Sequence, residues 1–84
     1  MIPDKRDVDL LRAAIERPGA HKREVYRELL EAGKGADSTL SRAIDCLGAC
    51  GYLRLVKNPG TIQVWATEKA KRFVSKLDKQ EAGQ

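Results

Sequence analysis

The feature that most constrains the fold is a change in the spacing of apolar residues near Gly51. Before this glycine, apolar residues recur about every three to four positions, which is the spacing of helices that bury one face. After it, apolar and polar residues alternate in two short runs, 52–57 and 62–66, as in half-buried strands. Pro59-Gly60 between the runs fits the centre of a type II turn, because proline presets φ and glycine accepts a positive φ. The sequence therefore predicts helices followed by a β-hairpin.

Three helices are predicted before the hairpin, over residues 7–17, 22–32 and 38–51. Pro18-Gly19 ends the first helix, and the glycines at 33 and 35 end the second. Asp37 or Ser38 is expected to cap the third, because either side chain can accept a hydrogen bond from a free amide group. The apolar stripe of this third helix consists of Leu40, Ala43, Ile44, Leu47 and Gly51, with Cys50 beside it.

The turn also predicts the hairpin register, with Lys57 opposite Ile62. Four apolar side chains then lie on the inner side of the hairpin, namely Leu53, Leu55, Val64 and Ala66. Arg54 and Trp65 lie opposite each other on the outer side, so Trp65 is expected to be a packing residue or a cation–π partner of Arg54. Thr67 is expected to cap a last helix, whose apolar stripe is formed by Ala70, Phe73, Val74 and Leu77.

The length of 84 residues predicts one α+β domain, 1–84, with an ordered core over about 7–77 and loose ends at 1–6 and 78–84. No apolar run reaches the roughly 18–20 residues that span a bilayer, and the start of the chain does not resemble a signal peptide. We therefore expect a soluble, cytoplasmic protein with no membrane partner. The sequence also has no paired carboxylates at a suitable spacing, no nucleophile–base pair and no phosphate loop, so an enzyme is not expected.

The two cysteines, Cys46 and Cys50, give little support for metal or disulfide chemistry. Together with His21 they supply three ligands, whereas a structural zinc site takes about four. Neighbours one turn apart on a helix form a poor disulfide pair, because their side chains run side by side. We expect small, mostly buried apolar residues here, with a redox-sensing thiol as the alternative, and no metal or cofactor.

The exposed face predicted for the third helix is small and polar. It carries Ser38, Ser41, Arg42, Asp45 and Ala49. A merely solvated face usually carries long side chains, as the second helix does with Arg23, Arg27, Glu28 and Glu31. Short side chains allow another molecule to approach the backbone closely, so this face is predicted to be a binding surface.

The net charge of +4 is distributed unevenly along the chain. Residues 1–51 contain nine Lys or Arg and nine Asp or Glu, whereas residues 52–84 contain seven and three. The whole excess therefore belongs to the hairpin and the last helix, which predicts that these segments supply any sequence-independent attraction to nucleic acid.

The order of elements and several local motifs resemble the winged helix-turn-helix of MarR-like and related archaeal or bacterial transcription regulators. The residues that carry this resemblance are 38–45, Leu47, 51–53 and 67–70, and the similar region extends over about 7–77. The resemblance implies a three-helix core, a two-stranded hairpin wing and a C-terminal helix. It also implies a small transcriptional regulator, associated with the nucleoid, that binds double-stranded DNA as a homodimer.

In that family the third helix lies in the major groove, and the wing contacts the minor groove or the backbone. Carried over by position, the helix contacts would come from 38–51 and the wing contacts from 52–66. The implied DNA-binding residues are Ser38, Thr39, Ser41, Arg42, Arg54, Lys57, Asn58 and Thr61. The implied dimer would use the last helix, through Phe73, Val74 and Leu77.

Two alternatives stay open. Arg42 also fits a surface ion pair, with Asp45 or Glu31 as its partner. The near-neutral third helix and Ala49 on its exposed face also fit a winged helix that serves as a protein-interaction module within a larger assembly.

Overall fold

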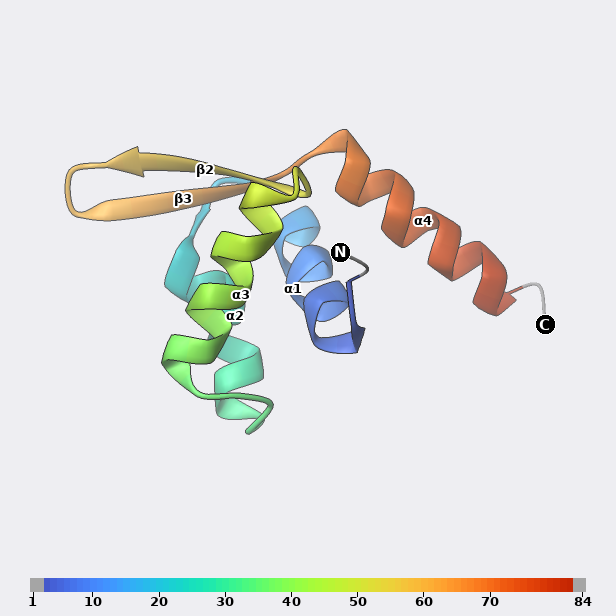
Figure 1. The fold of residues 1–84 in the computed structure, drawn as a ribbon, viewed down its shortest axis with the longest axis horizontal. Coiled ribbons are helices and arrows are strands. Elements are labelled where there is room, and N and C mark those ends of the chain that lie inside the picture. Colours follow the sequence, from blue (N-terminus) through green and yellow to red (C-terminus); the bar gives the residue numbers. More distant parts are fainter. Residues whose placement is uncertain (1–2, 83–84) are drawn as a thin grey trace.

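The computed structural model describes residues 3–82, which form four helices and a three-stranded antiparallel sheet. The elements, in chain order, are α1 (Lys5–Glu16), β1 (Ala20–His21), α2 (Lys22–Glu31), α3 (Asp37–Ala49), β2 (Leu53–Asn58), β3 (Thr61–Ala66) and α4 (Glu68–Ala82). The β2–β3 hairpin projects to one side of the helices and α4 to the other (Figure 1). The α+β class and the order of three helices, hairpin and helix are as the sequence predicts.

The sheet has a third strand, β1, that the sequence did not predict. Its residues Ala20 and His21 pair with Val64 and Gln63 of β3. The amide of Gly19 extends the pairing by donating to the Val64 carbonyl at 3.0 Å. A strand of two residues has no alternating pattern, so a search for hydrophobic periodicity misses it. The pairing of β1 with β3 fixes the start of α2 beside the hairpin.

The predicted hairpin register is confirmed at every pair. Lys57 lies opposite Ile62, and the pairs Leu55–Val64 and Leu53–Ala66 occupy the face toward the helices. Arg54 lies opposite Trp65, but among residues 3–82 no cation–π contact joins them. The indole ring of Trp65 instead lies over Gly19, so the packing interpretation of this residue is correct.

Both terminal helices are longer than expected. The helix α1 begins at Lys5 because Asp4 and Asp7 form a capping box, in which the Asp7 amide donates to Asp4 Oδ1 at 2.9 Å. The helix α4 continues to Ala82, and Arg12 holds it to α1 by hydrogen bonds of 3.2 and 2.6 Å to Asp78. This pairing lowers the pKa of Asp78. Residues 5–6 and 78–82, expected to be loose, are thus helical, while 1–2 and 83–84 lie outside the described residues.

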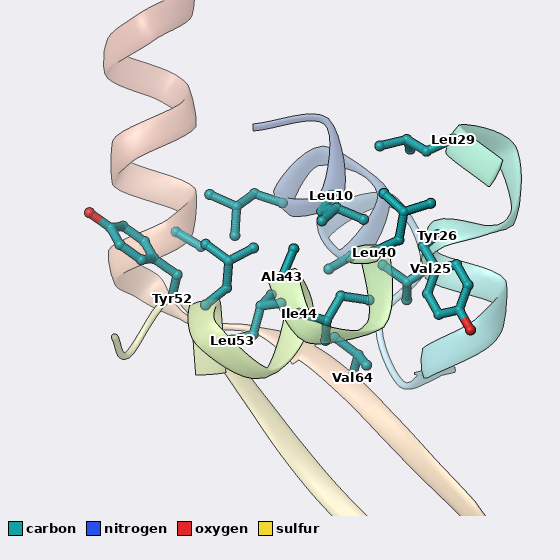
Figure 2. Close-up of a cluster of buried hydrophobic side chains, with 14 of the residues drawn as sticks. Leu10, Val25, Tyr26, Leu29, Leu40, Ala43, Ile44, Tyr52, Leu53 and Val64 are labelled. Carbon is teal, nitrogen blue, oxygen red and sulfur yellow. The ribbon is translucent and has the colours of Figure 1, made fainter. Parts of the chain in front are cut away.

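One cluster of buried side chains unites the helices with β2 and β3. The residues Leu40, Ile44 and Leu47 of α3 are completely buried in it, and Figure 2 shows Leu40 and Ile44 pointing into the cluster. Burial of such a side chain stabilises the fold by about 1.5–3 kcal/mol. The apolar stripe of α3 therefore fixes the rotation of this helix and turns its polar face to solvent.

The buried cluster also includes part of the stripe on α4. Val74 is buried, with 6% of its surface exposed, and the Phe73 ring meets Tyr52 edge-on at a centroid distance of 5.6 Å. Placing Val74 in a dimer interface is therefore wrong, because its surface is used within the chain. Thr67 starts α4 as predicted, since the Ala70 amide donates to its hydroxyl oxygen at 3.4 Å. That hydroxyl donates to the Gly51 carbonyl at 2.7 Å.

The cysteine prediction is only half correct. Both thiols are free, but Cys46 is exposed and Cys50 is half-buried. Cys46 directly precedes Leu47 and is therefore rotated by roughly 100° from the buried stripe. Within residues 3–82, no helix is long and apolar enough to cross a bilayer.

The contact between Gly19 and Trp65 gives a stability prediction. Gly19 has φ of +76°, and a Cβ atom there would lie 2.7 Å from Trp65 Cζ2. Gly19→Ala is expected to lower the free energy of unfolding by about 2–5 kcal/mol, because backbone strain and crowding add. Gly33→Ala is the matched control: φ is +72° and no heavy atom lies within 4 Å, so strain alone predicts a loss of about 1–2 kcal/mol. Urea denaturation of both variants measures the difference, and equal losses would contradict the packing of Trp65 on Gly19.

Candidate nucleic-acid interface

The N-terminal half of α3 presents the predicted helix contacts to solvent. Ser38, Thr39 and Arg42 are exposed, and Ser41 is half-buried. They lie on the outer side of α3 because Leu40 and Ile44 occupy the core. Successive residues at spacings of three and four share a helix face, so Ser38, Ser41 and Arg42 form one surface.

The start of α3 is held by a tyrosine rather than by a side-chain cap. Ala36 is the N-cap residue, and neither Asp37 nor Ser38 caps the helix as expected. The Asp37 carboxylate instead accepts a hydrogen bond of 3.0 Å from the Tyr26 hydroxyl of α2. No side-chain cap therefore accepts a hydrogen bond from the first amide groups of α3. Their N–H groups can donate to an anion, which the helix dipole also favours at this end.

Arg42 is not engaged in the ion pair that the sequence left open. Asp45 pairs with Lys22 of α2, at 2.7 Å between Nζ and Oδ1. Among residues 3–82, neither Asp45 nor Glu31 forms a salt bridge with Arg42. The Arg42 guanidinium therefore faces solvent with its donors available.

The four predicted wing residues do not share one face of the hairpin. Lys57 lies on the face toward the helices, as its partner Ile62 does, whereas Arg54 lies on the opposite face with Trp65. Asn58 and Thr61 pair across the turn, and the Asn58 amide donates to Gln63 Oε1 at 3.1 Å. Lys57 is therefore the wing cation on the side of α2 and α3, and Arg54 is separated from it by the sheet.

An open cleft of about 620 Å³ lies between the hairpin tip and the start of α2. Its lining includes Lys22, Arg23, Tyr26, Lys57 and Ile62, and we call it the basic cleft. Lys22 and Arg23 are functional candidates that the sequence reasoning missed. They are visible as adjacent cations, but only the pairing of β1 with β3 brings them beside the wing. The basic cleft can accept an anionic group such as a phosphate.

Within the described part of the chain, no three His, Cys, Asp or Glu residues gather into a group that could hold a metal ion. We define the candidate interface as the exposed face of α3, the basic cleft and the hairpin tip.

No protein-family model and no curated protein sequence matches the chain. Solved structures do. The PcaV transcriptional regulator from Streptomyces coelicolor, in complex with its natural ligand, superimposes with a TM-score of 0.79 at 22% identity, over 94% of this chain and 55% of that one. SSV1 F-93 gives a TM-score of 0.74 at 18% identity, over 99% and 89%. A MarR-family transcriptional regulator from Rhodococcus sp. RHA1 gives 0.61 at 21% identity, over 92% and 59%.

These likenesses confirm the fold. The chain spans about half the length of PcaV and most of the length of SSV1 F-93. Together with the helices and the three-stranded antiparallel sheet of residues 3–82, they identify a winged helix-turn-helix like that of the MarR-family structure, as the sequence motifs predict.

The hydrogen bond from Tyr26 to Asp37 predicts a pH effect. Burial, followed by the hydrogen bond to Asp37 and by its charge, raises the pKa of Tyr26 above its usual 10.0. The neutral phenol is thus favoured by folding, and its contribution is complete below pH 10 and is lost as the pH rises through the folded pKa. Tyr26→Phe should therefore show a smaller loss of stability between pH 9 and pH 11 than wild type does. It should also cost about 0.5–1.5 kcal/mol at neutral pH.

Urea denaturation at pH 7 and between pH 9 and pH 11 measures both effects, with Tyr52→Phe as the control that removes the other tyrosine. An alkaline loss as large in Tyr26→Phe as in wild type would contradict the assignment.

Proposed function

We propose that the chain is a small transcriptional regulator that binds double-stranded DNA, with α3 in the major groove and the wing on the backbone or the minor groove. The observation that carries the proposal is the exposed N-terminal half of α3, where Arg42 stands among short polar side chains and forms no ion pair with any residue of 3–82. A guanidinium in this position can form two hydrogen bonds with guanine O6 and N7. Ser38, Thr39 and Ser41 can donate to phosphate oxygens.

The distribution of charge supports the same orientation. Lys57 and Arg23 line the basic cleft beside the wing, and no carboxylate pairs with either within residues 3–82. In the proposed complex they hold the backbone phosphates that flank the groove occupied by α3. Asn58 and Thr61 at the hairpin tip contact the backbone or the minor groove, while Arg54 contributes long-range attraction from the far face of the wing.

The solved structures with this fold support a regulatory role, because PcaV and the Rhodococcus protein are both described as transcriptional regulators. The proposed protein is a binding protein without catalytic activity, and it acts in the cytoplasm on the nucleoid. It binds as a homodimer, so its operator has two-fold symmetry with half-sites about 10 base pairs apart, or a multiple of that.

A protein-interaction module is the second candidate function, and one observation favours it. Trp65 is the large hydrophobic residue left exposed in the described part of the chain, at 41%. It lies with Arg54 and Val56 along a hollow of about 650 Å³ on the sheet face opposite the helices. A protein partner that covers this face leaves α3 free, so Arg42→Glu would not disturb that complex.

Binding to DNA gives the first test. If four to six phosphates are contacted, log K should fall with log salt at a slope of about −4 to −5. Arg42→Ala should relax the sequence preference, whereas Lys57→Ala should weaken binding on all sequences and reduce the slope by about 1. Fluorescence anisotropy on selected and scrambled duplexes measures both effects. Lys5→Ala in α1 is the control, because it removes the same charge from a helix that contributes no residue to the basic cleft.

Two results would contradict the proposal. The absence of DNA binding by wild type at low salt would exclude it and leave the interaction module. Equal effects of Arg42→Ala on selected and scrambled DNA would exclude base reading by α3.

The homodimer gives a separate prediction. Of the three residues expected at its interface, Leu77 and Phe73 keep some exposed surface. Sedimentation equilibrium should find a dimer, and Leu77→Glu should dissociate it, because a buried unpaired carboxylate is costly in an interface. Circular dichroism controls for an unchanged helix content. A monomeric wild type at high concentration would exclude the dimer, and a dimeric Leu77→Glu would exclude this interface.

A further inference from the structure

Asp45 is an unexpected residue on the proposed reading face of α3. It lies one turn beyond Ser41 and Arg42, and 57% of its side chain is exposed. A carboxylate at this position meets the phosphate-lined walls of the groove, where like charges repel. An acid placed here weakens binding to all DNA unless its charge is compensated or it makes a favourable contact.

The favourable contacts open to a carboxylate in the major groove are limited. An ionised carboxylate is only an acceptor, and the base donors in this groove are cytosine N4 and adenine N6. Guanine and thymine present acceptors, O6, N7 and O4, which a carboxylate repels. Asp45 therefore distinguishes a base that presents an amino group in the major groove from a base that does not.

Lys22 supplies the compensation for the negative charge. Its ammonium lies 2.7 Å from Asp45 Oδ1, and its side chain is only 14% exposed, so its position is well defined. The pair is neutral overall, which removes the repulsion from the nearest phosphates. Among the hydrogen bonds of residues 3–82, none engages Asp45 Oδ2, so this oxygen can still accept from a base.

We infer that Asp45 is a specificity-determining residue that selects a cytosine or adenine amino group, and that Lys22 is the positioning residue that neutralises and orients it. This inference rests on the proposed DNA-binding function. It differs from the role of Arg42, because Arg42 adds affinity at a preferred base, whereas Asp45 acts chiefly by rejecting guanine and thymine. Lys22 reaches Asp45 from α2, so the two helices of the helix-turn-helix contribute to one contact.

The first experiment changes Asp45 and reads out base preference. Selection from a random duplex pool should yield cytosine or adenine at one position of each half-site for wild type. Asp45→Asn and Asp45→Ala should accept guanine and thymine there, with discrimination reduced about five- to hundredfold. Both variants should also bind scrambled DNA more tightly, because a negative charge is lost. Glu28→Gln is the matched control: it removes an exposed carboxylate that pairs with Arg17, away from α3, and should leave the preference unchanged.

The second experiment tests the role of Lys22 by a double-mutant cycle. Lys22→Gln should weaken binding to all sequences in the presence of Asp45, because the carboxylate is then uncompensated. In the Asp45→Asn background the same change should have a clearly smaller effect. Equal losses in both backgrounds would show that Lys22 acts on phosphate alone and would overturn its positioning role.

The results separate this inference from the proposed function. Wild-type binding with a preference that Asp45→Asn and Asp45→Ala leave unchanged would overturn the inference and retain the function. No DNA binding by wild type would overturn the function, and the inference with it. Thermal melting of each variant confirms that the fold is retained, so that a loss of binding reports on the interface.

Discussion

The rotation of α3 about its axis is the constraint on which the candidate interface depends. Leu40, Ile44 and Leu47 are completely buried, and burial of each contributes about 1.5–3 kcal/mol. Turning α3 by one residue would expose most of this stripe, at a cost comparable to the whole stability of about 5–15 kcal/mol that a domain of this kind has. The core therefore turns the whole opposite face of α3 to solvent, and only Asp45 on that face is positioned further, by its ion pair with Lys22. This is why short, flexible residues such as Ser38 can form a defined surface.

The wing is positioned by a second set of contacts that lie outside the helical core. The β1–β3 pairing joins the α1–α2 connection to the hairpin, and Trp65 covers Gly19 at the same junction. A two-stranded hairpin alone is marginally stable in water, so this third strand helps to hold the wing at a fixed angle to α3. The basic cleft follows directly, because the same pairing places Lys22 and Arg23 beside the hairpin tip.

Local patterns in the sequence predicted the helices and the hairpin, but neither the short strand β1 nor the contacts that shape the site. The Pro-Gly turn and the alternating runs determine the hairpin register, and every predicted pair is present because a shift by one residue would bury Arg54 and expose Val64. Features that depend on contacts between distant residues could not be read in the same way. The Lys22–Asp45 pair joins residues 23 positions apart. Asp37 accepts a hydrogen bond from Tyr26 and does not cap α3 as expected. Val74 is a further example, because an apolar stripe on a helix does not show whether it packs against the same chain or against a second copy. In the structure Val74 is buried within its own chain.

The net charge of residues 1–51 does not describe the charge of each surface that these residues form. Residues 1–51 have equal numbers of acidic and basic side chains, and several of them pair with one another, yet the pairing does not include every cation. The hollow between α1 and α2 is lined by charges of both signs, namely Asp9, Glu16 and Glu28 with Arg12 and Lys34. The basic cleft is lined by Arg23 and Lys57, and by Lys22, whose charge is balanced by Asp45. Because screening limits charge interactions to about 8–10 Å at moderate salt, a bound phosphate in the cleft would respond chiefly to Arg23 and Lys57. A region that is neutral in sum can therefore present a cationic face, and its charge asymmetry would orient the domain as it approaches an anionic partner.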